Sequence, residues 1–526
     1  MSEPKRFPSG AVASPHYLAS SAGLAVLADG GNALDAAIAT NLVLGVVTPY
    51  MCGYGGDLFA LIWAPPGRGG GAKDGLHAYN GSGRAPAAAT LEAVRGAAGS
   101  DRMPGAGPLT VSVPGAVEAW FKLLERFGTR SFADLAARAS RYAHDGFPLS
   151  AKAAGYIGAS ASIYTDDWAQ AWRSVYADAK AGARLRQPDL ARTIDVLRAE
   201  GPEPYYRGSI GEAIARTLRG HGALMDVEDL AQHAGDWVEP LSTSYRGVDV
   251  YELPPNSQGV VALEALNILE DLDLGPSGSA SRVHVLIEAV KLALADRNAY
   301  VTDPGYMRTP AAELASKEWA RRRRAEIDPD RASAPTTGRA AVGGTIYLCA
   351  ADADGMLVSL IQSNYVGFGS GVSVPGWGIN LQNRGAYFSL DPSHTNAIAP
   401  RKRTMHTLMP AMAFRDGSPW LVFGSMGGDG QAQTHVQFLN HVIDDGGNIQ
   451  DAIDAARWVV SPSDWSIAAE SRVGEAVMRA LRVRGHTIDA VGPYETQMGH
   501  AHAIEVTDDG YIAATDPRAE GAALGQ

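Results

Sequence analysis

The sequence has few of the residues that cross-link small extracellular folds or build metal centres. Only two of its 526 residues are cysteine, Cys52 and Cys349, so neither a disulfide framework nor a cysteine-based metal motif is expected. No apolar run approaches the roughly 20 residues that a membrane-spanning helix needs, and the first eight residues contain no apolar segment of a secretory signal. We therefore expect a cytoplasmic protein that does not enter a membrane.

Positively charged residues are also outnumbered by negatively charged ones. Charged residues make up 19% of the chain and the net charge is −12, which argues against a general nucleic-acid-binding protein. The sequence contains no phosphate-binding loop, no dinucleotide-binding glycine motif and no cluster of metal ligands. We therefore expect no cofactor and no metal. Hydrophobic residues account for 46% of the chain, which is typical of a globular protein with a large core.

A predicted β-hairpin carries the most informative residues. Two β-prone runs, 345–348 and 356–364, flank an Asp-Gly turn, and this arrangement is a strong hairpin signal. The first run opens with Thr345 directly after two glycines, and the second ends in Ser363 and Asn364. The hairpin would therefore bring a threonine hydroxyl close to polar groups at the end of its partner strand.

Such a threonine can cleave its own chain. Its hydroxyl would attack the carbonyl of Gly344, the acyl group would move from nitrogen to oxygen, and water would hydrolyse the ester. The new N-terminal amine of Thr345 could then act as the base for its own hydroxyl. The unpatterned segment 328–342 is the best candidate for an exposed, flexible stretch upstream. These residues alone also fit a buried strand threonine that follows a loop.

A second glycine-rich turn lies further along the chain. The strand expected at 420–423 ends at the turn 424–430, and a helix is expected from Gln431. Backbone N–H groups in such a strand-to-helix turn can converge on one negative charge, as in an oxyanion hole. The turn fits a helix-packing role equally well, and Asp429 is expected to cap the helix. Strands and helices alternate without a regular βαβ rhythm, which favours a layered α/β (α+β) sandwich.

Taken together, these motifs identify the chain as similar to gamma-glutamyltranspeptidase-type N-terminal-nucleophile (Ntn) hydrolases. The resemblance runs from about residue 10 to about residue 518. It rests on motifs in matching order: Asp29-Gly30-Gly31-Asn32-Ala33, Val113-Pro114-Gly115, Tyr245-Arg246-Gly247, Leu253-Pro254-Pro255, Ala295-Asp296-Arg297, Gly344-Thr345, Phe368-Gly369-Ser370-Gly371, Gly424-Ser425-Met426-Gly427-Gly428 and Asp516-Pro517-Arg518.

The resemblance implies a four-layer αββα sandwich and a precursor that cleaves itself between Gly344 and Thr345. Residues 1–344 would form the large subunit and residues 345–526 the small one, together making a single structural unit. A homo-oligomer of such heterodimers is left open.

The resemblance also assigns catalytic roles. Thr345 matches the nucleophile, and Ser363 matches a threonine whose hydroxyl supports it. Asn364 lies one position short of the asparagine that the family carries on that strand. Gly427 and Gly428 match the pair whose N–H groups hold the oxyanion.

The residues expected to bind the substrate depart from the gamma-glutamyl pattern. Ser82 stands where those enzymes have an arginine for the α-carboxylate, and Arg84 lies close by. Tyr387 stands at the place of the aspartate that binds the α-amino group. A free α-amino group would therefore meet no matching anion.

Arg384 aligns with a neighbouring polar amide, and His406 and Thr407 align with the paired serines that hold the α-carboxylate. An arginine fork suits a carboxylate. We therefore predict a small-molecule amide substrate whose acyl part is not glutamyl: an oxamate-like or dicarboxylic monoamide, or an N-acyl group like those that cephalosporin acylases take.

Other interpretations stay open. Arg384, Tyr387 and His406 could simply pack loops, with His406 as a hydrogen-bonded loop histidine and Arg84 as a surface residue. The enzyme could be a gamma-glutamyl hydrolase or transpeptidase that acts on glutathione or gamma-glutamyl amides. The chain could also be an unprocessed, inactive relative that binds a ligand.

Overall fold

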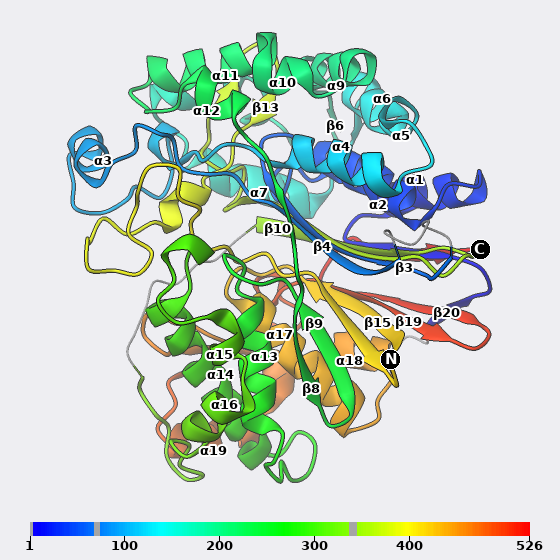
Figure 1. Cartoon of the computed structure of the whole chain (residues 1–526), viewed down its shortest axis with the longest axis vertical. Helices are drawn as coiled ribbons and strands as arrows, with labels where there is room; N and C mark the ends of the chain where they lie inside the picture. Colours follow the sequence, from blue (N-terminus) through cyan, green and yellow to red (C-terminus); the bar gives the residue numbers. More distant parts are fainter. Residues whose placement is uncertain (1–3, 68–73, 336–343) are drawn as a thin grey trace.

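The computed structural model describes residues 4–67, 74–335 and 344–526. Two seven-stranded sheets pack face to face, and helices cover the outer face of each, so that four layers are visible in Figure 1. The predicted αββα sandwich is confirmed. The flexible segment expected at 328–342 is described only in part: residues 328–335 are held by hydrogen bonds, contrary to that expectation, and residues 336–343 lie outside the described residues, so the expectation is not tested there.

The strands of the upper sheet in Figure 1 run in the order β21 (Ala522–Gly525), β2 (Ala11–Ser14), β10 (Gly344–Ala351), β11 (Leu357–Tyr365), β3 (Asp57–Ala64), β4 (Gly75–Gly81) and β7 (Asp236–Val238). The lower sheet runs in the order β1 (Lys5–Phe7), β20 (Gly510–Thr515), β19 (Ala501–Thr507), β15 (Ser418–Ser425), β14 (Ala411–Arg415), β9 (Val248–Glu252) and β8 (Leu241–Tyr245). Short strands form three smaller sheets: β5 (Phe147–Pro148) with β6 (Arg184–Leu185), β12 (Ser373–Val374) with β13 (Ile379–Asn380), and β16 (Trp458–Val460), β17 (Ile467–Glu470) and β18 (Ile488–Val491).

The helices divide between the two outer layers. The upper layer contains α1 (Tyr17–Ala28), α2 (Ala33–Val47), α4 (Ala116–Phe127), α5 (Phe132–Leu135), α6 (Ala137–Asp145), α7 (Ala151–Ala161), α9 (Pro188–Glu200), α10 (Glu203–Arg207), α11 (Ser209–Gly220) and α12 (Val227–Ala231), with α3 (Leu91–Ala98) at one side. The chain between α7 and α9 forms α8 (Gln170–Tyr176). The lower layer contains α13 (Gly259–Leu269), α14 (Ala280–Tyr300), α15 (Ala311–Leu314), α16 (Lys317–Arg324), α17 (Gly430–Leu439), α18 (Ile449–Asp454) and α19 (Glu475–Val483).

The central elements form where the sequence pattern predicts them. Helix α2 is alanine-rich and buried along its whole length, and Asn32 and Asp35 form a capping box at its start. Strands β10 and β11 pair antiparallel around the predicted Asp-Gly turn. Both strands are buried on both faces, because α2 packs on one side of their sheet and the second sheet packs on the other.

Each large sheet contains some strands that precede Gly344 in the sequence and others that begin at or after it. Strands β10 and β11 lie between β2 and β3, and β14 pairs with β9. The segments before and after the predicted cleavage point are therefore interleaved within the same hydrogen-bonded sheets.

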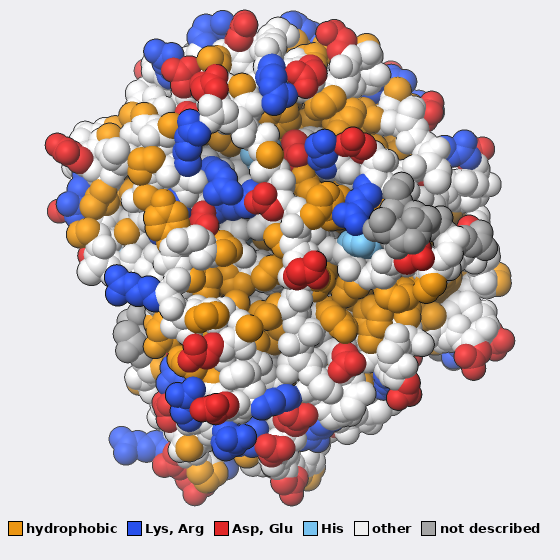
Figure 2. Space-filling view, in the orientation of Figure 1, with side chains coloured by type: hydrophobic (Ala, Val, Ile, Leu, Met, Phe, Trp, Pro, Cys, Tyr) orange, Lys and Arg blue, Asp and Glu red, His pale blue; other side chains and the backbone are white. Residues whose placement is uncertain are grey.

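The visible surface is mixed in character. On the face in Figure 2, lysine and arginine side chains alternate with aspartate and glutamate over both helical layers, and hydrophobic groups gather across the middle of the molecule. Within the described residues, none of the helices combines the length and the apolar character that crossing a bilayer would require.

The contact between the sheets predicts a sharp response to one added methyl group. A Cβ atom on Gly424 would lie 2.3 Å from Cε2 of buried Tyr347, so Gly424→Ala should destabilise the fold by about 1–3 kcal/mol through overpacking. Gly96→Ala is the control, since nothing lies within 4 Å of the added atom and an exposed helix gains about 0.5–1 kcal/mol from this change. Thermal and denaturant unfolding would measure both; equal stability of the two variants would contradict the packing.

Candidate active site

The hairpin brings Thr345 and Ser363 into direct contact. Thr345 is buried, and its Oγ1 donates a hydrogen bond of 3.0 Å to the hydroxyl of Ser363. That hydroxyl in turn donates to the carbonyl oxygen of Gly344 at 2.6 Å. A single serine hydroxyl therefore contacts both the predicted nucleophile and the carbonyl that the nucleophile would attack.

The backbone around this contact is irregular. The register of β10 against β11 shifts between Gly344 and Ile346, and Tyr365 has a φ of 81°. A tyrosine in this left-handed region costs on the order of 1–3 kcal/mol, and such strain is concentrated at functional sites. The strained residue directs its N–H to the oxygen of Ser363 at 2.7 Å, and this bond helps to fix the position of the hydroxyl.

Asn364 faces the other side of the strand, as alternation along β11 requires. Its N–H donates to the carbonyl of Met51 at 3.0 Å, and its side-chain amide lies 3.4 Å from the carbonyl of Pro49. No contact with Thr345 is present in the described part of the chain. A catalytic role for Asn364 stays a prediction.

The predicted glycine turn links β15 to α17, as the sequence indicated. Gly427 and Gly428 have φ values of 137° and 58°, which only glycine adopts readily. Neither of their N–H groups has a hydrogen-bond acceptor among the described residues, so both are available to an oxyanion. The carbonyl of Gly428 accepts a hydrogen bond of 3.0 Å from the side chain of buried Gln258.

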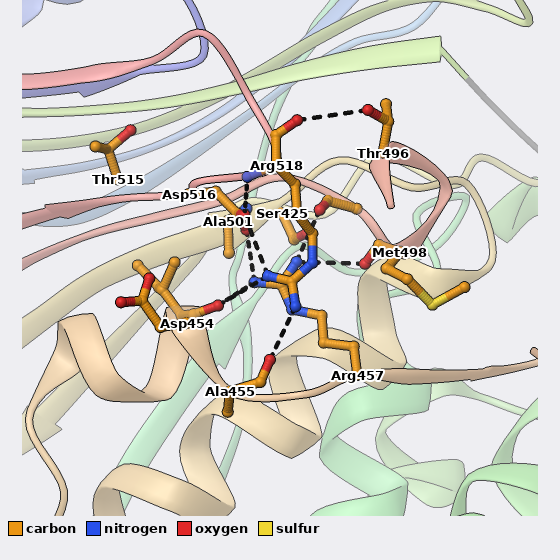
Figure 3. A network of polar contacts seen from close by, with 12 residues as sticks. Ser425, Asp454, Ala455, Arg457, Thr496, Met498, Ala501, Thr515, Asp516 and Arg518 are labelled. Carbon is orange, nitrogen blue, oxygen red and sulfur yellow. Dashed lines mark hydrogen bonds and ion pairs between the residues drawn. The ribbon is translucent and has the colours of Figure 1, made fainter. Parts of the chain in front are cut away.

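A buried network of arginines and acids supports the residues behind this turn. The Gly427 Cβ position lies 3.3 Å from Cα of Gly499, and Arg457 donates to the carbonyl of Gly499 at 2.8 Å. Arg457 also pairs with Asp516 at 2.6 Å, and Arg518 bonds both Asp516 and a second acid, Glu470. Figure 3 shows Arg457 and Arg518 converging on Asp516 from different segments.

Arg384 is buried and forms no direct ion pair with a carboxylate among the described residues, although Asp57 and Asp429 lie near enough to act on its charge. Its side chain donates to the Thr407 hydroxyl at 3.1 Å and lies over the ring of Tyr365 at 4.2 Å. Its Nε and Nη2 atoms are buried and have no partner among the described residues. Burial lowers the pKa of Arg384 to about 10, so the guanidinium is charged at neutral pH. The ring that Arg384 covers belongs to Tyr365, whose N–H bonds the hydroxyl of Ser363.

His406 lies beside that cation but is fully engaged. Its Nε2–H donates to Asp57 at 3.1 Å, and its Nδ1 accepts from the N–H of Leu408 at 3.3 Å. Burial and the charge of Arg384 lower the pKa of His406 to about 3, so the ring is neutral. The structure therefore places His406 as a hydrogen-bonded loop histidine.

Tyr387 contacts a carboxylate that sequence reasoning missed. Its hydroxyl donates to Asp429 at 3.2 Å, and Asp429 also forms an ion pair with buried Arg297. Asp429 occupies the N-cap position of α17 as expected, but its side chain makes no capping bond to the helix. The Ala295-Asp296-Arg297 motif was visible in the sequence, but nothing there indicated its partner.

Arg84 lies apart from this group. Its side chain is 42% exposed and pairs with Asp303 at 3.3 Å. Ser82 is buried, and its hydroxyl donates to Asn80 at 2.7 Å. The structure therefore brings together Thr345, Ser363, Tyr365, Arg384 and Thr407, with Arg84 at the surface.

Comparison with known proteins places this geometry in a family. The sequence profile of gamma-glutamyltranspeptidase matches residues 19–526. The glutathione hydrolase-like YwrD proenzyme of Bacillus subtilis is 38% identical over 98% of both chains. The chain belongs to the gamma-glutamyltranspeptidase family. The predicted resemblance is thus confirmed, and with it the class of amide-bond hydrolases and acyltransferases.

Two further relatives lie on a divergent branch of the gamma-glutamyltranspeptidase family. The oxamate amidohydrolase proenzyme of Klebsiella pneumoniae is 36% identical over 98% of both chains. The crystal structure of cephalosporin acylase from Bacillus halodurans superposes with a TM-score of 0.94 at 40% identity, covering 100% of this chain and 97% of the acylase.

The Arg457–Asp516–Arg518 network predicts acid sensitivity. Burial would raise the pKa of Asp516, but the two arginines lower it from 3.8 to about 2. This lowered pKa contributes stability above pH 4 that is lost as the pH falls toward 2. Asp516→Asn should cost about 3–5 kcal/mol at neutral pH, because it leaves buried arginine charge uncompensated, and should flatten the decline between pH 4 and 2.

Chemical denaturation at a series of pH values would measure this effect. Asp271→Asn is the control, since that carboxylate is exposed to solvent where it pairs with Arg324; solvent screens such a pair, so both the loss of stability and the change in the acid profile should be much smaller than for Asp516→Asn. A profile for Asp516→Asn that parallels that of the unmodified protein would refute the argument.

Proposed function

We propose that this protein is a self-processing N-terminal-threonine amidohydrolase. It cleaves its own chain between Gly344 and Thr345 into a large subunit, 1–344, and a small subunit, 345–526, and then hydrolyses the amide of a small acid through an ester on Thr345. Its substrate carries a carboxylate on the acyl part. The observation that carries the substrate class is the buried, unpaired charge of Arg384.

Self-cleavage follows from the hairpin contacts. The Oγ1 of Thr345 attacks the carbonyl carbon of Gly344, whose oxygen already accepts a hydrogen bond from Ser363. Collapse of the tetrahedral intermediate breaks the carbon–nitrogen bond, and the hydroxyl proton passes to the departing amine. Water then hydrolyses the ester, leaving a carboxylate on Gly344 and a free amine on Thr345.

The same threonine then acts on the substrate. An α-amine has a pKa of about 7.7–8.0, so a useful fraction is neutral and can accept the hydroxyl proton as Oγ1 attacks the amide. The N–H groups of Gly427 and Gly428 stabilise the oxyanion, and each such donor is worth about 10²–10³ in rate. The amine product leaves with the proton, and water releases the acid.

Electrostatics supports an acyl group that ends in a carboxylate. Burying a charge is costly unless it is paired and hydrogen-bonded, and Arg384 offers two nitrogen atoms that lack an acceptor among the described residues. A carboxylate bound in a fork would satisfy both nitrogens. The nearby carboxylate of Asp429 is already shared by Arg297 and Tyr387, so the ammonium of a glutamyl group would find no anion of its own.

There is room beyond this pocket for a larger group. A cavity of about 900 Å³ adjoins Tyr387 and Arg297 and is lined by both apolar and polar side chains, among them Met103, Phe388 and His394. The names of two relatives, an oxamate amidohydrolase and a cephalosporin acylase, support an acyl group that is not glutamyl. We therefore favour an oxamate-like or dicarboxylic monoamide.

Gamma-glutamyl hydrolysis is the second candidate. It is supported by the names of two relatives: the glutathione hydrolase-like YwrD proenzyme of Bacillus subtilis and the glutathione hydrolase proenzyme of Escherichia coli, which is 29% identical. An inactive ligand-binding protein is less well supported, because the contacts among Thr345, Ser363 and Gly344 are those that peptide cleavage requires.

Processing gives the first test. The purified protein should appear on a denaturing gel as chains of 344 and 182 residues, whereas Thr345→Ala should remain a single band near 55.2 kDa because it lacks the attacking hydroxyl. Ser363→Ala should slow processing about 10- to 100-fold, since it loses a hydrogen bond to the reacting carbonyl. Full cleavage and full turnover by Thr345→Ala would refute the proposal.

Substrate selectivity gives the second test. Arg384→Met should lower kcat/KM for oxamate or glutaryl amides about 10- to 100-fold, and Arg384→Lys should not restore it because lysine lacks the fork. Arg415→Met is the matched control: that arginine also lies over an aromatic ring, Trp420, and activity should stay unchanged. Efficient turnover of gamma-glutamyl anilides by the processed enzyme would favour the second candidate instead.

A further inference from the structure

Four buried polar side chains meet at the interface between α14 and the segment that follows α19. His284, Glu288 and Lys291 are spaced three and four residues apart on α14, so they share one face of the helix. His486 approaches them from the chain beyond α19, within the proposed small subunit. All four side chains are buried, and none belongs to the site described above.

The hydrogen bonds of this cluster run in one direction. Lys291 can only donate, and it donates to Glu288 at 2.9 Å and to Nδ1 of His486 at 3.3 Å. The Nε2–H of His486 then donates to Nδ1 of His284 at 2.7 Å. The Nε2–H of His284 is left to donate to the carbonyl of Asp328 at 2.8 Å. Both rings are therefore neutral.

The chain of donors ends on the segment that leads toward Gly344. Besides Asp328, this segment contributes Ser333, whose N–H donates to Glu288 at 2.8 Å and whose carbonyl accepts from Lys291 at 3.0 Å. The proposed small subunit adds three more contacts: Ala332 N–H donates to the carbonyl of Arg484 at 2.7 Å, Arg484 Nε donates to the carbonyl of Pro329 at 3.3 Å, and Trp465 Nε1 donates to the carbonyl of Pro335 at 2.7 Å. Residues 328–335 are thus held at several backbone atoms.

Two imidazoles and a carboxylate within reach of one another also form a donor set for a metal such as zinc. Here, however, the ammonium of Lys291 lies on the carboxylate of Glu288, and one imidazole donates to the other. A metal ion would have to displace a charged lysine and break the bond between the rings. The hydrogen-bonded arrangement therefore accounts for these residues better than a metal site does.

We propose that four residues, His284, Glu288, Lys291 and His486, form a latch. The latch holds residues 328–335, the upstream end of the linker that leads to Gly344, against parts of both proposed subunits. It thereby helps to present the Gly344–Thr345 bond to Ser363 for self-cleavage. This inference rests on the proposed function. The latch residues act as positioning residues, since they touch the linker and not the reacting atoms.

The physical basis is a shorter tether. With residues 328–335 fixed, only the chain from 336 to 344 is left to connect the latch to the reacting bond. Fixing residues 328–335 reduces the conformational entropy of the chain upstream of Gly344. Less entropy is then lost when the Gly344 carbonyl adopts the geometry in which Thr345 attacks it. The latch should therefore raise the rate of processing and leave the turnover of already processed enzyme unchanged.

The test compares these two rates in the full-length protein. Lys291→Met removes the donor that holds Glu288, His486 and Ser333 together, and Ser333→Pro removes the linker N–H while leaving the buried cluster intact. In a cell-free translation time course, loss of the full-length band should be about tenfold or more slower in both variants, the factor expected when a hydrogen bond to a charged group is lost. The kcat of material that has completed processing should stay within about twofold of the unmodified enzyme.

Arg282→Met is the matched control. Arg282 lies on the same helix and also reaches the proposed small subunit, where it pairs with Asp445 in the segment after α17, but none of its hydrogen bonds or ion pairs involves the described residues 328–335. It should lower the melting temperature without slowing cleavage. Unmodified processing rates in both Lys291→Met and Ser333→Pro, or equal slowing by Arg282→Met, would overturn the latch. Failure of the unmodified chain to process at all would instead overturn the proposed function.

Discussion

One serine hydroxyl connects the chemistry of this protein to its fold. Ser363 contacts the hydroxyl of Thr345 and the carbonyl of Gly344, and it can do so only because β10 and β11 are adjacent with a shift in register at the reacting bond. The rest of the sandwich keeps these two strands buried between a helical layer and a second sheet. The strain at Tyr365 is tolerated because this packing determines the position of the residue from every side.

The buried arginines differ in whether a carboxylate of the protein pairs with them. Arg297, Arg457 and Arg518 each face a carboxylate and hold backbone or loops in place. Arg384 has an aromatic ring and a hydroxyl instead. This contrast between Arg384 and the three paired arginines is the strongest structural reason to expect an anionic acyl group.

The sequence was most informative where local chemistry decides structure. The Asp-Gly hairpin and the glycine turn before α17 were predicted near their observed bounds, because each depends on neighbouring residues. Partners far apart in the chain were not predictable in the same way. Nothing near His406 indicated Asp57, and nothing near Asp429 indicated Arg297, since those pairs exist only once the sheets have formed. Arg84 was close to the expected motif in sequence, but its side chain turned to the surface.

The interleaving of strands has a consequence for what happens after the chain is broken. Strands β10 and β11 are hydrogen-bonded between β2 and β3, and β14 is bonded to β9, so the two fragments share ladders that run through the centre of the molecule. They cannot part or trade places with fragments from another copy without melting both sheets. If the chain is cut at the proposed bond, each catalytic centre would therefore be built from the two parts of a single polypeptide, and fragments of different molecules would not exchange.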